Sequence, residues 1–461
     1  MPNVSRNSIN LSVKNATEYV NSIKAGERTL AFYLGSVDTP SISTNSETKR
    51  NDVYKEASFF KRIEKSEIDI VSRKINFGGT AFQTWNPYDD NIKNYYTVYN
   101  NNVYLVIGND LYNTDQNNEQ LIATTLPTHT DGIQKYSDGY EYLYLYTLNA
   151  SNPIVTSNNL WMPVPDTTMS YYSGKLIYKK IDANSISDIT ISYKDPEITI
   201  LSDTGTGAKI RLKTVVQTSP SVTVSNRKYK IIGIEVINIG DTAYIDYDIS
   251  SSLSAVMTKE SSANISRIAS AITLGFSSIE GFNLRNLLQA QYSIITLIAN
   301  TEDIESVIEQ TQFNSFGIVE DIKDDSDNLV FTPTSTTKIV SNNVKITATQ
   351  LSGSTSILDD FEVKTTLTLQ NKTKYSKGKV ASSKLSGGSS LVSEIEISDK
   401  NQYQINDTLK SAKSSSVYII NSVTRPSTKA FSGKVLHIGS TNFSTEGSSP
   451  KTFVAQVIQR F

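Results

Sequence analysis

Residue types that commonly carry chemistry are scarce in this chain of 461 residues. It contains no cysteine and only two histidines, His129 and His437. The lack of cysteine excludes disulfides, thiolate nucleophiles, iron–sulfur clusters and thiolate zinc sites. The histidines are far apart in sequence and neither lies in an H-E-x-x-H motif, so we expect each to be structural or exposed. The nucleophile motif G-x-S-x-G is also absent.

A glycine-rich segment, residues 203–209 (DTGTGAK), has a superficial likeness to a phosphate-binding loop. The Walker spacing G-x-x-x-x-G-K-S/T is absent, however. Residues 210–216 have the pattern of a strand, where a phosphate loop requires the N-terminus of a helix. We therefore interpret the segment as a turn and expect no bound cofactor.

An acidic segment, residues 321–328 (DIKDDSDN), raises the question of a calcium site. An EF-hand loop needs Gly at position 6 and Glu at position 12, but a loop starting at Asp325 has Val330 and Thr336 there. We interpret the segment as a solvated acidic turn and expect no metal. A pair of catalytic carboxylates brought together by the fold leaves no local spacing signature, so that alternative stays open.

Composition and charge narrow the class of protein. Lys and Arg number 44 and Asp and Glu 46, which gives a formal charge of −2 with no long run of either sign. We expect no nucleic-acid binding, because it would need a basic face. The N-terminus has no pattern of a secretory signal and no run approaches about 18 apolar residues, so we expect synthesis in a cytoplasm and no membrane insertion. The length predicts about three domains.

The elements that would position any site are mostly strands. Hydrophobic residues make up 38% of the chain, with 25 Tyr and 15 Phe. This aromatic content, together with many Ser, Thr and Asn, favours strands and turns over helices. One helix is expected between an N-cap at Ser12 and a C-terminal Gly26. A second is expected over residues 52–64, and helical character returns at residues 281–289.

A period-two pattern begins near Tyr95. Residues 95–99 and 103–107 flank three asparagines, which tolerate positive φ, and this predicts a hairpin. In residues 140–146 (YEYLYLY) the tyrosines share one strand face and the leucines the other, so we expect both faces to be covered. We expect a turn at Asp138 and Gly139 that fixes the register of this strand, and a buried Trp161 nearby.

Two segments have the character of small β modules. Residues 180–249 contain strand-like segments at 189–193, 198–201, 210–216, 229–237 and 243–249, separated by glycine turns. Residues 334–429 are rich in Ser, Lys and Thr and contain a weak two-copy repeat of 28 residues that begins at Tyr375 and Tyr403. We expect the two copies to form related hairpins in one small β domain.

Several motifs, taken in order, resemble one protein family: the dimeric wedge subunit of the baseplate of T-even-like, contractile-tailed bacteriophages. The clearest is residues 138–144 (DGYEYLY), followed by residues 161–165 (WMPVP). The others are residues 19–23 (YVNSI), 35–40 (GSVDTP), 85–90 (WNPYDD), 313–319 (FNSFGIV) and 432–436 (SGKVL), with Phe453 and Phe461. Each motif is short, but their shared order spans the chain. Around residue 275 the family often has a glycine–histidine-rich turn, and this chain has GFSS there.

The resemblance implies a non-enzymatic structural protein of the virion. It would be a homodimer bound to other wedge proteins in the tail baseplate and assembled in the bacterial host cytoplasm. Together with the residue patterns, it predicts an α+β, mostly β fold, with antiparallel sheets in a sandwich core and few helices. The core would comprise residues 1–179, 250–333 and 430–461. Residues 180–249 and 334–429 would be the two inserted modules.

Two other functions compete with this one. In an adhesin-like tail protein that recognises host surface glycans, the tyrosine rows and Ser/Thr loops would contact sugars. An enzyme that degrades host polysaccharide would need a carboxylate pair in a cleft. Fibre and spike proteins commonly form trimers through long repetitive segments, and only one weak repeat occurs here. We therefore favour the structural protein, with no catalytic residues, no cofactor, no metal and no small-molecule substrate.

Overall fold

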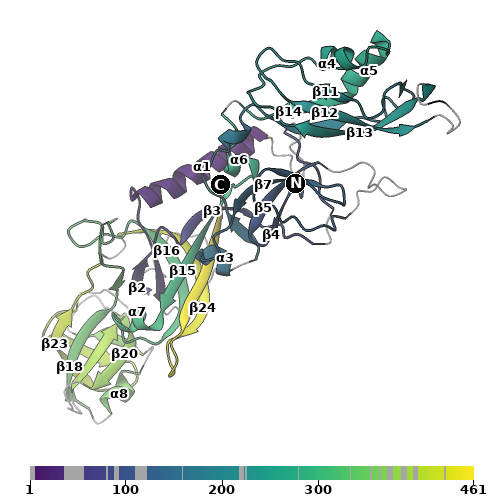
Figure 1. The fold of residues 1–461 in the computed structure, drawn as a ribbon. Helices are drawn as coiled ribbons and strands as arrows, with labels where there is room; N and C mark the ends of the chain where they lie inside the picture. Colours follow the sequence, from purple (N-terminus) through teal and green to yellow (C-terminus); the bar gives the residue numbers. More distant parts are fainter. Residues whose placement is uncertain are drawn as a thin grey trace. The chain divides into compact units, whose positions relative to one another are not determined.

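The computed structural model of the protein is mostly β, with antiparallel sheets and few helices in its described part, as the sequence predicts (Figure 1). The structure describes residues 6–35, 57–78, 81–87, 93–108, 122–157, 159–217, 223, 226–278, 280–332, 334–353, 356–362, 365–370, 377–385, 392–397, 403–429 and 432–461. Residues 36–40 and 88–90 of the family-like motifs lie outside these ranges.

The chain forms two compact units. Residues 1–17, 69–293 and 460–461 make up the first, and residues 18–68 and 294–459 make up the second. The segments predicted to share one core, residues 1–179, 250–333 and 430–461, fall in both units. The division into a core with two inserted modules stays a prediction.

The second unit is built on a five-stranded sheet whose strands come from distant parts of the chain. Its order is β17 (Ile339–Ser341), β2 (Ala57–Arg62), β1 (Leu30–Gly35), β16 (Gln312–Glu320) and β24 (Lys434–Ser444). Neighbouring strands pair antiparallel throughout this sheet. The first two strands of the unit therefore pair with strands that lie about 280 residues later, β1 with β16 and β2 with β17.

Phenylalanine rings fill one side of this sheet, where β15 (Tyr292–Asn300) and its neighbour β25 (Thr452–Arg460) lie. The Phe453 ring of β25 packs on Phe32, Phe316 and Phe443, with centroids 6.2, 5.7 and 5.5 Å away. On the other side of the sheet, Tyr33 packs against Phe60 at 6.2 Å. Both faces are thus covered, and Phe453 ties the last strand to the centre of the sandwich.

Close packing also requires a glycine at one position of this sheet. Gly317 of β16 pairs with Tyr33 of β1. A Cβ atom at this position would lie 2.4 Å from the Tyr33 ring and 2.4 Å from the carbonyl oxygen of His437. Only glycine lets the two neighbouring strands keep this register, because any larger side chain would collide with backbone.

A closed six-stranded barrel forms the rest of the second unit. Its strands are β18 (Val344–Ser352), β19 (Thr366–Leu369), β20 (Lys377–Leu385), β21 (Val392–Ile397), β22 (Thr408–Ser411) and β23 (Val417–Thr424). The pairs β20–β21 and β22–β23 are antiparallel hairpins, as the repeat predicts. Tyr403 of the second copy is buried in the barrel core, while Tyr375 lies outside the described residues. The short helix α8 (Ile357–Asp360) contributes Ile357 to the same core.

The first unit contains the predicted tyrosine-rich sheet. Its order is β4 (Tyr96–Tyr99), β5 (Asn102–Gly108), β7 (Glu141–Thr147) and β6 (Ile133–Lys135). The β4–β5 hairpin is confirmed, and Asn100 and Asn101 have φ of 47° and 63° at its turn. The turn before β7 is also confirmed, because Gly139 has φ of 86° and the Asp138 carboxylate accepts a hydrogen bond from the Tyr140 N–H.

Trp161 differs from its prediction. It lies in β8 (Trp161–Pro163), which pairs with β3 (Ile68–Arg73), and its side chain is only half-buried. Its ring packs on Tyr292 at 4.9 Å. Strand β8 lies at the edge of its sheet, where fewer neighbouring strands are available to cover the indole.

A second sheet of the first unit has the order β10 (Thr190–Ile191), β13 (Tyr229–Asn238), β12 (Lys209–Val216) and β11 (Glu197–Thr199). The strand predicted at residues 243–249 is wrong. These residues form a loop that ends in α4 (Ile249–Val256), because the Asp248 carboxylate caps this helix through the N–H groups of Ser250 and Ser251. The hydrophobic core around the sheet also includes residues of β9 (Leu176–Ile181), α5 (Ser262–Ala271) and β14 (Ile272–Phe276).

The helix predictions succeed only in part. Helix α1 (Arg6–Ala25) ends before Gly26, which has φ of 84°, as expected, but Ser12 lies inside the helix and is not its N-cap. The buried residue Ile9, which precedes Ser12, already lies in this helix. The helix predicted over 52–64 is wrong, because Ala57–Arg62 is the buried strand β2 and residues 51–56 lie outside the described part.

The remaining helices are short. Helix α6 (Leu284–Leu287) lies in the predicted segment 281–289, and its N-cap is Asn283. The others are α3 (Pro153–Ser157), α7 (Thr301–Glu305) and the 3-10 turn η2 (Ser170–Tyr172). In the described part of the chain, no helix is both long enough and apolar enough to cross a lipid bilayer.

The Phe453→Ala variant should be strongly destabilised, because removing a buried phenylalanine ring costs about 3–5 kcal/mol. The Leu351→Ala variant, in strand β18 of the same unit, is the control. Leu351 is 57% exposed, so its truncation should change stability by less than about 0.5 kcal/mol. Urea denaturation followed by circular dichroism measures both. Equal stability of the two variants would contradict the placement of Phe453 in the sandwich.

Candidate functional site

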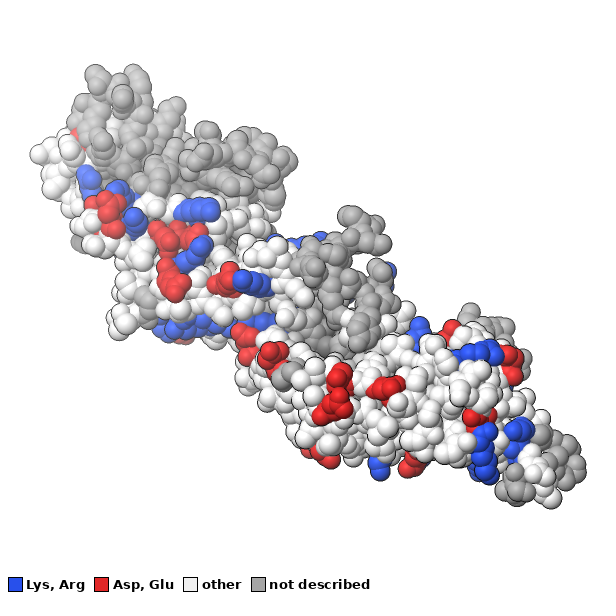
Figure 2. All heavy atoms as spheres, turned by 90° about the horizontal axis from the view of Figure 1, so that it is seen from above, with Lys and Arg blue, Asp and Glu red and all other residues white. Residues whose placement is uncertain are grey.

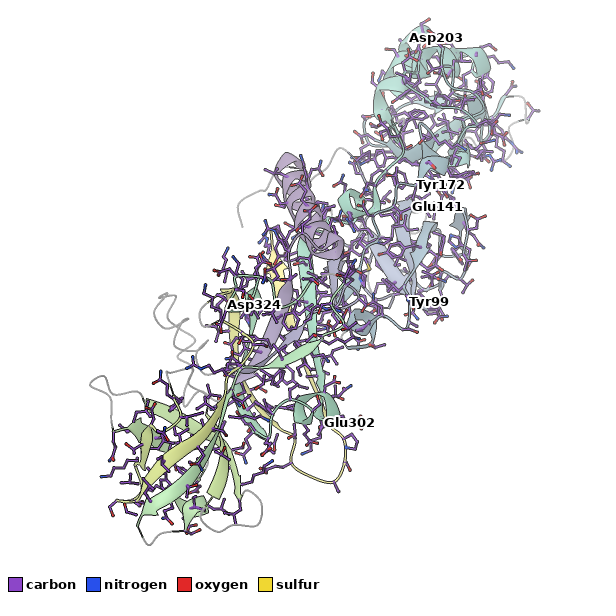
Figure 3. All side chains as sticks on the ribbon, turned by 90° about the vertical axis from the view of Figure 1, so that its left-hand side faces the viewer. Tyr99, Glu141, Tyr172, Asp203, Glu302 and Asp324 are labelled. Atoms are coloured by element: carbon purple, nitrogen blue, oxygen red, sulfur yellow. The ribbon has the colours of Figure 1, made fainter. Side chains whose placement is uncertain are left out.

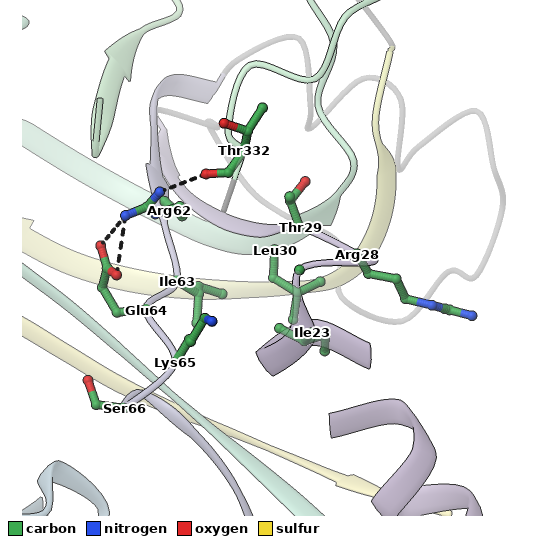
Figure 4. A pocket seen from close by; sticks show the side chains of 11 residues that line it. Ile23, Arg28, Thr29, Leu30, Arg62, Ile63, Glu64, Lys65, Ser66 and Thr332 are labelled. Carbon is green, nitrogen blue, oxygen red and sulfur yellow. Dashed lines mark hydrogen bonds and ion pairs between the residues drawn. The ribbon is translucent and has the colours of Figure 1, made fainter. Parts of the chain in front are cut away.

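A pocket of about 300 Å³ opens in the second unit (Figure 4). It lies where the end of α1, the start of β1 and the turn after β2 meet Thr332. Its floor is apolar, formed by Ile23, Leu30 and Ile63, and its rim is polar. The remaining lining residues are Gly26, Arg28, Thr29, Arg62, Glu64, Lys65 and Ser66.

Local chain geometry builds two walls of this pocket. Helix α1 stops because Gly26 adopts a left-handed conformation, in which its N–H donates to the Ile23 carbonyl. After β2, the chain turns back through a loop in which the buried Glu67 carboxylate accepts a hydrogen bond from the Glu64 N–H at 2.7 Å. Burial raises the pKa of Glu67, and this hydrogen bond opposes the shift.

Arg62 holds the rim together. Its Nη1 donates to the carbonyl oxygens of Thr332 and Ser335, both at 2.9 Å, and its Nη2 donates to the Glu64 carboxylate at 3.0 Å. Figure 4 shows this guanidinium between Thr332 and Glu64. All of these partners are fixed by the fold, so the arginine positions the rim.

Arg28 and Lys65 supply the other positive charges of the rim. Arg28 pairs with Glu320 at 3.0 Å and extends outward in Figure 4, while Lys65 is exposed. Burial raises the pKa of the nearby Tyr19 to about 12, and the Glu320 carboxylate adds to the shift, while Arg28 opposes it. Tyr19 is therefore neutral at physiological pH and cannot serve as a general base there.

The residues that line this pocket are suited to binding a ligand. Glu64 is the carboxylate in its lining, and Arg62 neutralises it. Arg28 is likewise paired with Glu320, so the pocket offers a bound group an apolar floor and the exposed Lys65 at its rim. At about 300 Å³, the pocket is at the small end of the range for small-molecule sites. Its residues come from three distant segments, so no local sequence signal could have revealed it.

The glycine-rich segment at residues 203–209 is a loop that leads into β12, as predicted. Asp203 lies in this loop (Figure 3). A Cβ atom on Gly205 would lie 2.3 Å from the Tyr244 ring, and the Tyr244 hydroxyl accepts a hydrogen bond from the Ala208 N–H at 2.8 Å. The glycine therefore makes room for a buried tyrosine.

The acidic segment at residues 321–328 is a turn after β16. The Asp324 carboxylate, labelled in Figure 3, accepts hydrogen bonds from the N–H groups of Ser326 and Asn328, both at 2.9 Å. Asp327 pairs with Lys429 at 2.6 Å. These carboxylates are engaged by the turn itself and by a lysine. Among the described residues, no group of three or more Asp, Glu or His side chains is placed to hold a metal ion.

The two histidines lie in different surroundings. His129 Nδ1 is 2.9 Å from the Tyr136 hydroxyl, and its ring packs on Tyr104 at 5.1 Å. His437 lies in β24 with its ring 5.8 Å from Phe316. Burial lowers the pKa of both imidazoles below the ordinary value of 6.5. The structure thus gives each histidine an aromatic packing role.

A buried ion pair in the first unit was not foreseen from the sequence. Lys179 of β9 donates to the Glu141 carboxylate of β7, and the two side chains are only 5% and 9% exposed. Gly108 leaves space for the pair, because a Cβ atom there would lie 2.9 Å from the Glu141 carboxylate. The pair connects two sheets of the unit, and its two residues are 38 positions apart, so sequence spacing gave no signal.

Comparison of the chain with models of known protein families and with curated protein sequences found no match.

The Arg62→Ala variant should lose about 1–3 kcal/mol of stability, because two carbonyl oxygens and the Glu64 carboxylate lose their donor. Arg28→Ala is the matched control on the same rim. The Arg28 side chain is 50% exposed, and its ion pair should contribute at most about 1 kcal/mol. Chemical denaturation of both variants provides the measurement, and a larger loss for Arg28→Ala would contradict the assignment.

Acid should destabilise the protein through its histidines. Because burial lowers both folded-state pKa values, the unfolded chain binds more protons as the pH falls below about 6.5. Their contribution to stability is complete above that pH and declines from there toward the folded-state values. The His129→Gln/His437→Gln variant should show a flatter dependence of unfolding free energy on pH between 7 and 5. A steeper dependence in this variant would contradict the lowered pKa of the two imidazoles.

Proposed function

We propose that this protein is a structural component of a phage tail baseplate wedge, where it bridges neighbouring wedge proteins through protein–protein interfaces. It acts as a homodimer in the virion and assembles in the host cytoplasm. The observation that carries the proposal is the shared order of the motifs that resemble the wedge family, from residues 19–23 to residues 432–436. No enzymatic activity is part of the proposal.

The position of the tyrosine-rich strand favours assembly over glycan recognition. Tyr140 and Tyr142 of the clearest motif are buried, and their rings stack on each other with centroids 5.9 Å apart. Tyr146 is half-buried and its hydroxyl donates to the Pro163 carbonyl at 2.9 Å. A sugar-binding platform needs exposed ring faces, and these rings are used for packing between and within sheets.

Surface charge also suits assembly with other proteins. Figure 2 shows positive and negative side chains close together on the visible face, with large uncharged areas between them. Several charges of the chain are paired, such as Arg211 with Glu197 and Arg267 with Asp188. Balanced charge of this kind favours protein partners over a polyanion such as DNA, which would select a continuous basic surface.

Purified chain should form a dimer and should enter a larger complex when mixed with neighbouring wedge proteins of the same phage. Size-exclusion chromatography with light scattering measures both masses. We expect both a dimer and a larger complex because a two-fold interface closes on itself and leaves the other surfaces of each copy free for partners. An unrelated β-rich protein of similar size, substituted for the chain, is the control.

Three results would contradict the proposal. A chain that stays separate from every wedge protein would remove the assembly role. A stable trimer that binds defined oligosaccharides would favour the adhesin. Turnover of a polysaccharide that one Asp or Glu substitution abolishes would favour the hydrolase.

A further inference from the structure

Strand β25 presents an unusual sheet edge. It is nine residues long and pairs with β15 on one side, and no described strand pairs with its other side. An edge strand exposes a row of unpaired backbone N–H and C=O groups that can pair with another chain. Natural proteins usually protect such edges with short strands, bulges, prolines or charges.

The other edges of the described sheets carry such protection. Edge strands β17, β8, β6 and β11 have three residues each, β10 has two and β4 has four. The long edge strand β24 is interrupted by two register shifts against β16. In the two-stranded sheet, β14 has a register shift and β9 carries two lysines. Strand β25 has neither proline nor charge from Thr452 to Gln459.

The side chains of β25 are also suited to pairing with another strand. Val454 and Ile458 are 51% and 44% exposed, although both are β-branched and apolar. They lie four residues apart, with Gln456 between them, so all three side chains point to the same side of the sheet. On the opposite side, Phe453 is anchored in the sandwich core. The strand is therefore held rigidly while its apolar pair faces solvent.

We propose that β25 pairs antiparallel with β25 of a second copy, about a two-fold axis through Gln456. This inference rests on the homodimer of the proposed function and assigns its interface. A register centred on Gln456 places Val454 of each copy directly opposite Ile458 of the other. The Val454–Ile458 pair therefore occurs twice, once in each half of the interface, and each exposed apolar side chain gains one apolar neighbour. This is the self-complementarity that a two-fold contact requires.

Charge is compatible with this pairing. The one charged residue of the strand is Arg460, four positions from the centre. At about 3.3 Å per residue, the two copies of Arg460 are separated by about 26 Å along the paired strands. That distance exceeds the Debye length of about 8 Å at physiological salt, so their repulsion is screened.

Two double variants with equal numbers of substitutions test the register. Val454→Lys/Ile458→Lys places lysine opposite lysine twice and should raise the dimer dissociation constant at least about tenfold. Val454→Lys/Ile458→Glu places lysine opposite glutamate twice and should keep the constant within about threefold of the wild type. Sedimentation equilibrium gives the constants. Both sites are exposed, so circular dichroism should show unchanged folding in both variants.

Cysteine cross-linking provides an independent test, because the chain has no cysteine of its own. Gln456→Cys places the two thiols opposite each other at the two-fold axis, and oxidation should produce a covalent dimer. Val454→Cys is the control. Its two copies would be about 13 Å apart along the strands, which exceeds the Cα separation of about 7 Å that a disulfide can span.

The outcomes separate this inference from the proposed function. A wild-type dimer that tolerates Val454→Lys/Ile458→Lys, or that fails to cross-link through Gln456→Cys, overturns the β25 interface and leaves the dimer in place. A variant that stays dimeric but no longer joins wedge proteins assigns the edge to a different partner and also overturns the inference. A wild-type chain that is monomeric yet joins wedge proteins overturns the dimer and its interface while keeping the assembly role.

Discussion

The packing of phenylalanine rings between β25 and the five-stranded sheet is the interaction on which the second unit depends. Phe453 contacts rings from β1, β16 and β24, so one side chain joins strands from the beginning, middle and end of the chain. Aromatic pairs of this geometry add to the stability that burial of their area provides. The pocket next to β1 and the exposed edge of β25 both depend on this core, because it fixes the strands that form them.

Sequence patterns predicted the local features best. The β4–β5 hairpin could be predicted because Asn100 and Asn101 tolerate the positive φ that its turn requires. The end of α1 at Gly26 could be predicted for a similar reason. Strand β2 was missed because all of residues 57–60 are buried, and a strand covered on both faces has no alternation to distinguish it from a helix stripe.

Features made by distant residues could not be predicted. The Arg62 network joins a strand end to carbonyl groups about 270 positions later, and the partners are backbone atoms that any sequence could provide. The half-buried state of Trp161 depends on β8 being an edge strand, which only the sheet order reveals. The same applies to the edge of β25, whose residues alone would fit a central strand equally well.

The strand order of the second unit has a consequence for biosynthesis. Its sheet begins with β1 at Leu30, yet β24 and the core-filling Phe453 lie after residue 433. During synthesis on the ribosome, the sandwich cannot form until these last strands have been translated. The six strands of the barrel, in contrast, are all translated by residue 424. Synthesis interrupted before β24 would thus yield a folded barrel attached to an open, aggregation-prone sheet, and only a chain translated through β25 would hold the complete unit.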